Sequence, residues 1–362
     1  MNKKIWKIHS LILALLMAAV MGAQCPVSVA AAEVTGTEKA AETAGADTAS
    51  EAAKAADSDV TVDATITDED TIKIKDAEDL LEFAENCTLD SWSQGKTVVL
   101  QADIYLDDVD FAPIPTFGGT FDGKGHSIVG LDITDSISPA GLFSVLQEGA
   151  VVKNLNVAGN VTPSGENSAV GGIAGENYGE VKNCTFTGTV SGTQNAGGIV
   201  GFNGYSGEVT NCRVSGEILG ESMTGGIAGY NQGTLSKCKN SAAVNHVSVD
   251  AQISIDNIDL DISMDVKQWT TGNIFDAASD TGGIAGYSTG IIQDCSNAGT
   301  VGYPHIGYNL GGIAGRSCGY ITGCTNDGEI YGRKDVGGIV GQMEPYILVE
   351  LSESGIGQIQ NE

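Results

Sequence analysis

The chain has 362 residues, 50 glycines, 6% aromatic residues and a formal net charge of −28. The glycines follow no strict Gly-X-Y period, which excludes collagen, and the scarcity of aromatic residues disfavours an ordinary globular core of large side chains. The negative charge disfavours binding to nucleic acid and to anionic lipid, because both would repel the chain.

Residues 1–32 have the pattern of a secretory signal peptide. Lys3, Lys4 and Lys7 precede the apolar stretch 11–23, which is too short to span a bilayer comfortably, and small residues at 28–32 offer cleavage sites. Lipidation at Cys25 and an uncleaved anchor are the alternatives, although Gln24 fits a lipoprotein signal badly. No later apolar run is long enough for a membrane helix, so we expect a secreted or cell-surface protein without membrane insertion after signal cleavage.

Residues 33–70 are rich in Ala, Thr, Glu and Asp, and are predicted to form a disordered linker. A strand is expected from Thr71, followed by a short helix whose N-cap is Asp76, with Asp79 in the capping-box position. The apolar face of this helix would cover the N-terminal end of the fold, since an unpaired strand edge recruits other chains. A surface helix without that role is the alternative. Strand-like runs follow at 97–100, 104–106, 127–129, 141–143 and 151–157.

The sequence Gly-Gly-Ile-(Ala/Val)-Gly then occurs six times, beginning at Gly171, Gly197, Gly225, Gly282, Gly311 and Gly337. A cysteine follows the first glycine by 13 residues in four copies and by 15 in another, namely Cys184, Cys212, Cys238, Cys295 and Cys324. A small residue stands four positions and an apolar residue six positions after each cysteine, so these residues share one strand face. Consecutive units of 26 to 29 residues fit three short strands, which is one rung of a parallel β-helix. Propeller blades of about 40 or more residues are disfavoured.

An insertion interrupts the repeats between Cys238 and Gly282. Apolar residues alternate with polar ones on both sides of Asp256-Asn257. A two-residue turn there would bring all of these apolar residues to one face. We therefore predict an inserted β-hairpin over about 246–276, a β-helix over 71–346, and a C-terminal tail over 347–362 that is either an end or the start of a further region.

The repeats resemble the GLUG-motif proteins of bacterial surfaces and secretions. The resemblance covers about 71–345 and rests on the six Gly-Gly-Ile copies, together with 119–126 and Ala140-Gly141-Leu142-Phe143. It implies a right-handed parallel β-helix on an adhesin-like bacterial protein. Some streptococcal immunoglobulin-A proteases carry such repeats beside a zinc protease domain with a His-Glu-x-x-His motif. None of the four histidines here is followed by Glu, so that activity is not carried over.

The repeated cysteines are predicted to form an inward column of free thiols. Their spacing does not match zinc ligands, and in-register cysteines about 4.8 Å apart do not favour a disulfide. Cys87 and Cys318 lie outside this column and are the better candidates for a bridge or a reactive thiol. No cofactor is expected, although the acidic residues Asp103, Asp107, Asp108 and Asp110 and the aspartates of the hairpin could hold Ca²⁺ loosely. A solvated acidic surface is the alternative.

Three further patterns suggest catalytic or binding sites. Gly286–Gly290 and Gly315–Gly319 match the Gly-x-Ser-x-Gly elbow, but Asn177 and Asn231 occupy the same slot in other repeats, which indicates a turn. Residues 118–124 match part of a phosphate-binding loop, but they are interpreted as a tight turn at Phe121-Asp122-Gly123, with Asp122 capping backbone amides. The tentative ligand contacts are the aromatic residues in one slot of three repeats, Phe202, Tyr230 and Tyr287, which would either bind sugar rings or stack on each other.

The sequence therefore predicts an all-β protein, a right-handed parallel β-helix with a capping helix and an inserted hairpin. We expect a non-enzymatic module that serves adhesion or ligand display, with a host or cell-wall glycan or protein as its partner. A structural stalk within a longer protein and a polysaccharide-acting lyase or hydrolase on the same scaffold are the alternatives.

Overall fold

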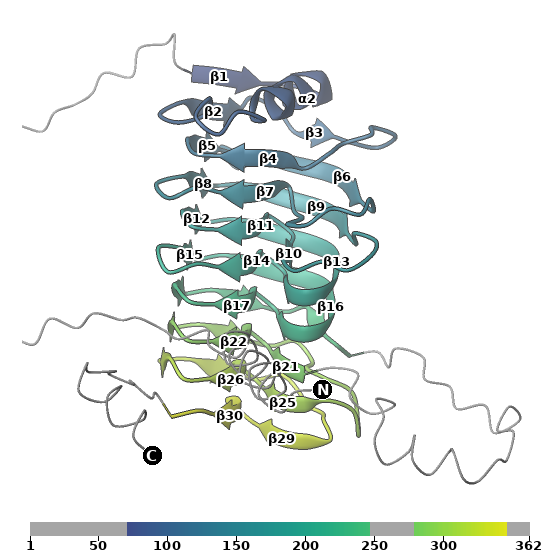
Figure 1. The fold of residues 1–362 in the computed structure, drawn as a ribbon, viewed down its shortest axis with the longest axis vertical. Helices are drawn as coiled ribbons and strands as arrows, with labels where there is room; N and C mark the ends of the chain where they lie inside the picture. Colours follow the sequence, from purple (N-terminus) through teal and green to yellow (C-terminus); the bar gives the residue numbers. More distant parts are fainter. Residues whose placement is uncertain (1–70, 247–278, 346–362) are drawn as a thin grey trace, which may run out of the picture. The chain divides into compact units, whose positions relative to one another are not determined.

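The computed structural model describes residues 71–246 and 279–345, all within the unit spanning residues 67–362. The predicted signal peptide, linker, hairpin and tail lie outside these described residues, apart from His246. The described chain winds through stacked rungs, and each rung contributes strands to parallel sheets (Figure 1). The predicted parallel β-helix is thus confirmed.

Three sheets form the faces of the helix. Sheet 1 contains, in spatial order, β1 (Thr71–Ile74), β2 (Thr97–Leu100), β5 (Thr120–Asp122), β8 (Val151–Lys153), β12 (Glu180–Lys182), β15 (Glu208–Thr210), β18 (Thr234–Ser236), β23 (Ile291–Gln293) and β27 (Tyr320–Thr322). Sheet 3 contains β4 (Ile114–Phe117), β7 (Phe143–Leu146), β11 (Ala174–Asn177), β14 (Val200–Asn203), β17 (Ala228–Asn231), β22 (Ala285–Ser288), β26 (Ala314–Ser317) and β30 (Val340–Met343).

Sheet 2 is the most extensive and has a branched order. Its main path contains β3 (Ile104–Tyr105), β6 (Ser127–Ile133), β9 (Asn156–Val161), β13 (Thr185–Gly197), β16 (Arg213–Gly225), β19 (Lys239–Asn240), β24 (Ser296–Asn297) and β28 (Thr325–Asn326). The shorter strands beside this path are β10 (Val170–Gly171), β20 (Ala243–Val244), β21 (Ser279–Gly282), β25 (Tyr308–Gly311) and β29 (Lys334–Gly337).

The Gly-Gly-Ile repeats lie in register on successive rungs. The first glycines pair in a single column from Gly171 through Gly197 and Gly225 to Gly282, Gly311 and Gly337. At the second position, a Cβ atom on Gly172 would collide with the ring of Phe186 and with the backbone of the next rung. The repeat therefore needs glycine because neighbouring backbones approach too closely for a side chain, and not because of an unusual φ angle.

The repeat isoleucines fill the core. Their side chains are fully buried in five consecutive copies, Ile173, Ile199, Ile227, Ile284 and Ile313. The backbone carbonyl of Ile199 accepts hydrogen bonds from the N–H groups of both Ile173, at 2.9 Å, and Ala174, at 3.1 Å. Each rung is thus joined to the next by backbone hydrogen bonds and by an aliphatic column. The last rung described leaves its isoleucine, Ile339, 41% exposed.

The predicted capping helix is α2 (Ala77–Asn86). The Asp76 carboxylate accepts a hydrogen bond from the Asp79 N–H at 3.0 Å, and the Asp79 carboxylate accepts one from the Lys75 N–H at 3.0 Å. In the usual capping box, the side chain at the third helical position accepts from the N–H of the N-cap residue. Here Asp79 accepts from the N–H of Lys75, one residue before the N-cap Asp76. The ring of Phe83 is buried against Trp92, Phe117 and Phe121 at the N-terminal end of the core, which is where the helix was expected.

Two local predictions need correction. The run 151–157 is not one strand, because Asn154 adopts φ 54° and turns the chain from β8 in sheet 1 to β9 in sheet 2. The turn expected at Phe121-Asp122-Gly123 instead begins after strand β5, which includes Phe121 and Asp122, and Lys124 takes the left-handed conformation. At the first corner the buried side chains Val152 and Leu155 stand three residues apart, so the alternation changes phase at Asn154.

Candidate functional site

The three tentative ligand-contact residues form a column on sheet 3. Phe202 in β14 pairs with Tyr230 in β17, which pairs with Tyr287 in β22. Their strand neighbours Asn203, Asn231 and Ser288 are fully buried, so the aromatic side chains project to the opposite, outer face. The sequence prediction that these three residues share one slot is borne out by this register.

The rings of this aromatic column pack against each other. The rings of Tyr230 and Tyr287 stack with centroids 5.0 Å apart and planes 13° apart. Phe202 meets Tyr230 at 5.5 Å and 61°, and Tyr178 at 5.9 Å and 65°, so its contacts are edge-to-face. Tyr230 is only 8% exposed. A ligand would therefore meet ring edges, hydroxyl groups and the half-buried rings of Tyr178 and Phe202.

Arg316 ends the aromatic column and brings a charged cluster with it. It pairs with Tyr287 across the sheet, and its guanidinium lies 4.1 Å from the centroid of the Tyr287 ring. Asp280 at 3.0 Å and Glu344 at 3.1 Å hold the guanidinium from two sides. Burial raises the pKa of Asp280, and burial together with Cys318 and Glu344 raises the pKa of Tyr287. No sequence pattern marks this cluster, whose members come from three separate segments.

Buried asparagines line the inner side of sheet 3. Asn177 donates to Asn203 and Asn203 donates to Asn231, both at 2.8 Å, and Asn231 donates to Ser288 at 3.1 Å. Ser288 and Ser317 continue this asparagine ladder and are fully buried. A nucleophile elbow needs an exposed hydroxyl, so neither Gly-x-Ser-x-Gly match has the geometry of an esterase.

The periodic cysteines form the predicted inward thiol column. Cys184, Cys212, Cys238 and Cys295 are at most 1% exposed, and Cys324 on the next rung is half-buried. None of the described cysteines is in a disulfide. Burial raises the pKa of Cys212 well above its ordinary value. Burial also raises the pKa of Cys87 to about 12, so this thiol does not fit the reactive role suggested for it.

Thiol labelling should reflect this burial. In the native protein we expect a bulky maleimide to leave the four inner thiols and Cys87 unmodified, because the reagent cannot reach the core. Cys318 should react first. Cys324 should react more slowly, because a hydrogen bond to Cys295 and burial raise its pKa. Unfolding in urea should expose all of them. Peptide mass spectrometry after timed labelling would measure the order. Simultaneous native labelling of all five periodic cysteines would contradict the inward column.

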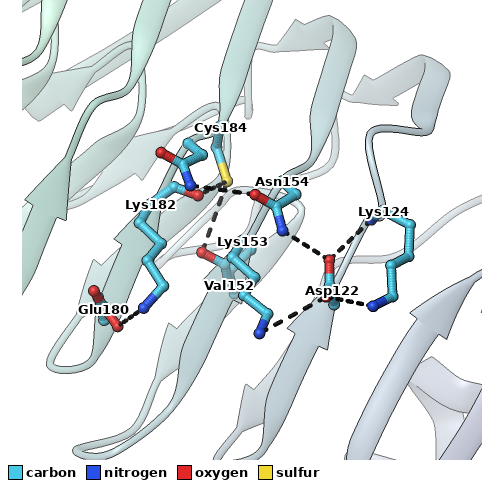
Figure 2. A network of polar contacts seen from close by, with 9 residues as sticks. Asp122, Lys124, Val152, Lys153, Asn154, Glu180, Lys182 and Cys184 are labelled. Atoms are coloured by element: carbon cyan, nitrogen blue, oxygen red, sulfur yellow. Dashed lines mark hydrogen bonds and ion pairs between the residues drawn. The ribbon is translucent and has the colours of Figure 1, made fainter.

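Asp122 is the centre of a polar network at the corner between sheets 1 and 2 (Figure 2). Its carboxylate accepts hydrogen bonds from the Lys124 N–H and the Asn154 side chain, both at 3.0 Å. It also pairs with the ammonium groups of Lys124 at 3.0 Å and Lys153 at 3.7 Å. Burial alone would raise the pKa of Asp122, but these donors and charges outweigh burial and hold the pKa below its ordinary value. The predicted capping role of Asp122 is confirmed.

Replacing Asp122 by Asn should cost about 2 kcal/mol of unfolding free energy at pH 7, since hydrogen bonds to a charged group are lost. A lowered native pKa adds stability above the ordinary Asp value of 3.8, and that stability is lost as the pH falls through the native pKa. The difference between wild type and Asp122→Asn should therefore shrink in acid. Urea unfolding between about pH 3 and pH 7 would measure it, with the exposed Asp132→Asn as control. A pH-independent difference would contradict this account.

The acidic residues near the N-terminal end do not form a metal site. Asp103 accepts a hydrogen bond from the Ser127 N–H at 2.9 Å and pairs with His126 at 3.3 Å. Within residues 71–246 and 279–345, no three His, Cys, Asp or Glu side chains are grouped to hold a metal ion. The hairpin aspartates of the Ca²⁺ prediction lie outside that range.

Comparison with known proteins places these features in a wider group. The family model described as "The GLUG motif" matches residues 166–191 and 192–219, which are consecutive rungs. Halomucin from Haloquadratum walsbyi is 36% identical over 112 residues, which cover 31% of this chain and 1% of halomucin. The chain thus corresponds to a small fraction of that protein's length.

A solved structure shares the fold. The crystal structure of a putative immunoglobulin A1 protease from Bacteroides ovatus matches with a TM-score of 0.52 and 18% identity, covering 81% of this chain and 87% of that one. No helix among the described residues is long and apolar enough to cross a membrane. The two matched segments coincide with consecutive rungs described above, so this chain carries GLUG-motif repeats on a parallel β-helix.

Proposed function

We propose that this protein is a secreted or cell-surface module that binds an extracellular ligand for adhesion or display and catalyses no reaction. The GLUG repeats and the similarity to halomucin support a surface-associated repeat protein. In this proposal the β-helix acts through geometry: backbone hydrogen bonds hold each rung, and outward side chains recur about 4.8 Å apart along the stack. An extended ligand lying along the rungs would meet the same chemistry repeatedly.

The observation that carries the proposal is the aromatic column on the outer face of sheet 3. Phe202, Tyr230 and Tyr287 follow each other on consecutive rungs, and Tyr178 and Arg316 extend the row at either end. Ring edges with hydroxyl groups suit a sugar, whose C–H and O–H groups need apolar and polar contacts together. A host or cell-wall glycan is therefore the ligand that we favour.

A glycan array with the full chain would test this function. We expect Phe202→Ala and Tyr178→Ala to weaken binding, because their rings keep the accessible surface of the column. Tyr303→Ala is the matched control, since Tyr303 is a 39% exposed tyrosine outside the column. If Phe202→Ala and Tyr178→Ala bind glycans as well as the Tyr303→Ala control does, the aromatic column is not part of the binding site. Binding to no glycan and to no extracellular-matrix protein would leave the structural stalk as the better function.

One observation supports the enzymatic alternative. Asp280 and Glu344 flank Arg316, and burial raises the pKa of Asp280, as acid–base catalysis of sugars requires of its general acid. The structural neighbour, at 18% identity, supports the fold alone. A polysaccharide-cleavage screen with Asp280→Asn and Glu344→Gln would decide the question, because loss of a measured activity in both variants would establish a lyase or hydrolase.

A further inference from the structure

Positive charge gathers at one corner of this acidic protein. Half of the lysines and arginines that the structure describes lie where sheet 1 turns into sheet 2, and we call these residues the basic edge: Lys124, Lys153, Lys182, Arg213, Lys237 and Lys239. The whole chain carries a formal charge of −28. Random placement would not be expected to concentrate cations on a single edge, so the basic edge needs its own explanation.

The register places these cations on consecutive rungs. Lys124 follows β5, Lys153 ends β8 and pairs with Lys182 at the end of β12, and Arg213 pairs with Lys239 where sheet 2 begins. Five successive rungs, from β5 to β18, thus each supply one or two cations to the same corner. The next rung has Asp294 at the turn position that Lys237 occupies, so the row ends there.

A rigid row of turns supports the basic edge. Asn154, Asn183, Asn211 and Lys237 occupy equivalent turns, all with φ between 52° and 56°. Asn183 donates to Asn154 at 3.2 Å and Asn211 donates to Asn183 at 2.8 Å. These side-chain bonds join neighbouring turns along the corner. The cations therefore project from a backbone that is ordered before any ligand arrives, which lowers the entropy cost of binding.

Carboxylates neutralise only part of the basic edge. Lys124 and Lys153 share Asp122, and Lys182 pairs with Glu180 at 2.6 Å (Figure 2). Arg213, Lys237 and Lys239 are exposed and form no ion pair among the described residues. The C-terminal half of the edge thus presents three uncompensated cations on two adjoining rungs.

We propose that the basic edge binds an anionic polysaccharide, lying along the stack of rungs. A linear polymer with carboxylate or sulfate groups can follow a row of cations about 4.8 Å apart while staying narrow. A duplex nucleic acid is wider and more densely charged, and the net charge of −28 on this chain would repel its phosphates. The basic edge lies on a different face from the aromatic column, so this inference does not depend on the proposed glycan site there.

Binding of the full chain to polygalacturonate would test the inference, with dextran as the neutral polymer. The variant Arg213→Gln/Lys237→Gln/Lys239→Gln should weaken binding about tenfold, because each lost contact contributes a fraction of the 1.4 kcal/mol that a factor of ten represents. The control Lys75→Gln/Lys96→Gln/Lys334→Gln removes the same charge elsewhere and should change binding less than about twofold. Glu180→Gln frees Lys182 and should strengthen binding.

Raising the salt concentration from about 0.05 M to about 0.5 M should weaken polygalacturonate binding of the wild-type protein, and should affect the triple variant less. The inference is overturned if both triple variants lose binding equally, which would reflect net charge alone. It is also overturned if polygalacturonate does not bind, or if a DNA duplex binds more tightly. Circular dichroism of each variant would confirm that the β-sheet signal is retained.

Discussion

Replacing Asn203 by Asp should destabilise the β-helix by about 3–5 kcal/mol at neutral pH, the cost of leaving a buried charge without a partner. The Asn203 side chain is fully buried, and its amide donates to Asn231 at 2.8 Å and to the carbonyl of Gly207 at 3.1 Å. An aspartate keeps the bond from Asn177 but has no N–H for the other two acceptors. Its charge would also face the Asn231 carbonyl oxygen.

The pH dependence of Asn203→Asp gives a second readout. Burial would raise the pKa of the new carboxyl group, so the protonated form is favoured in the folded state. Stability with a raised native pKa is present at low pH and is lost as the pH rises through that value. The urea concentration at the midpoint of unfolding of this variant should therefore decrease as the pH is raised from about 4 to about 7.

Asn211→Asp is the matched control for Asn203→Asp. Asn211 also donates to an asparagine at 2.8 Å, but it lies on the exposed ladder at the sheet 1–sheet 2 corner. Water can solvate the new carboxylate there, and a cost below about 1 kcal/mol is expected. Equal losses of stability from Asn203→Asp and Asn211→Asp would show that the cost of the substitution does not depend on the burial of the asparagine.

Replacing Phe83 by Ala should remove about 3–5 kcal/mol of stability from the N-terminal rungs, the usual cost of truncating a buried aromatic side chain. The Phe83 ring is 2% exposed and lies about 6 Å from the rings of Trp92, Phe117 and Phe121. Because each rung contacts mainly its neighbours, loss of the cap should loosen the nearest rungs first. Hydrogen exchange should show early opening of β1 and β2, and light scattering should show association through the uncovered edge.

Leu81→Ala is the control for the cap. Leu81 lies on the same helix but is only partly buried, so its truncation should cost less than that of Phe83. Uniform loss of protection along the whole stack in Phe83→Ala would indicate a single cooperative unit instead of rungs that open from the end.

The repeats made most of the fold predictable. Six copies of Gly-Gly-Ile, at nearly constant spacing apart from one insertion, predict that one backbone path is repeated, and in-register stacking then follows because the copies bury the same face. The inward thiols and the shared slot of Phe202, Tyr230 and Tyr287 could be inferred from that periodicity, and the capping helix from its N-cap Asp76 and the apolar face that follows. The corners at Asn154 and Lys124 were not inferred, because a single residue in the left-handed conformation makes each of them and neither residue is a glycine.

The candidate sites show where periodicity stops being informative. Arg316 meets Asp280 and Glu344 only because strand β26, strand β21 and the chain following β30 reach the same place, and no spacing in the sequence connects the three. The basic edge has the same origin: its members stand at different offsets within their repeats, and only the corner between sheets 1 and 2 brings them together.

The sequence by itself determined the repeated rung, the residues that face its core and the kind of protein that such repeats build, because a tandem repeat gives every copy the same local solution. The tertiary structure alone decided which outward side chains become neighbours. Strand pairs between rungs join residues 23 or more positions apart, and the winding of the chain around three faces decides which of these residues share an edge.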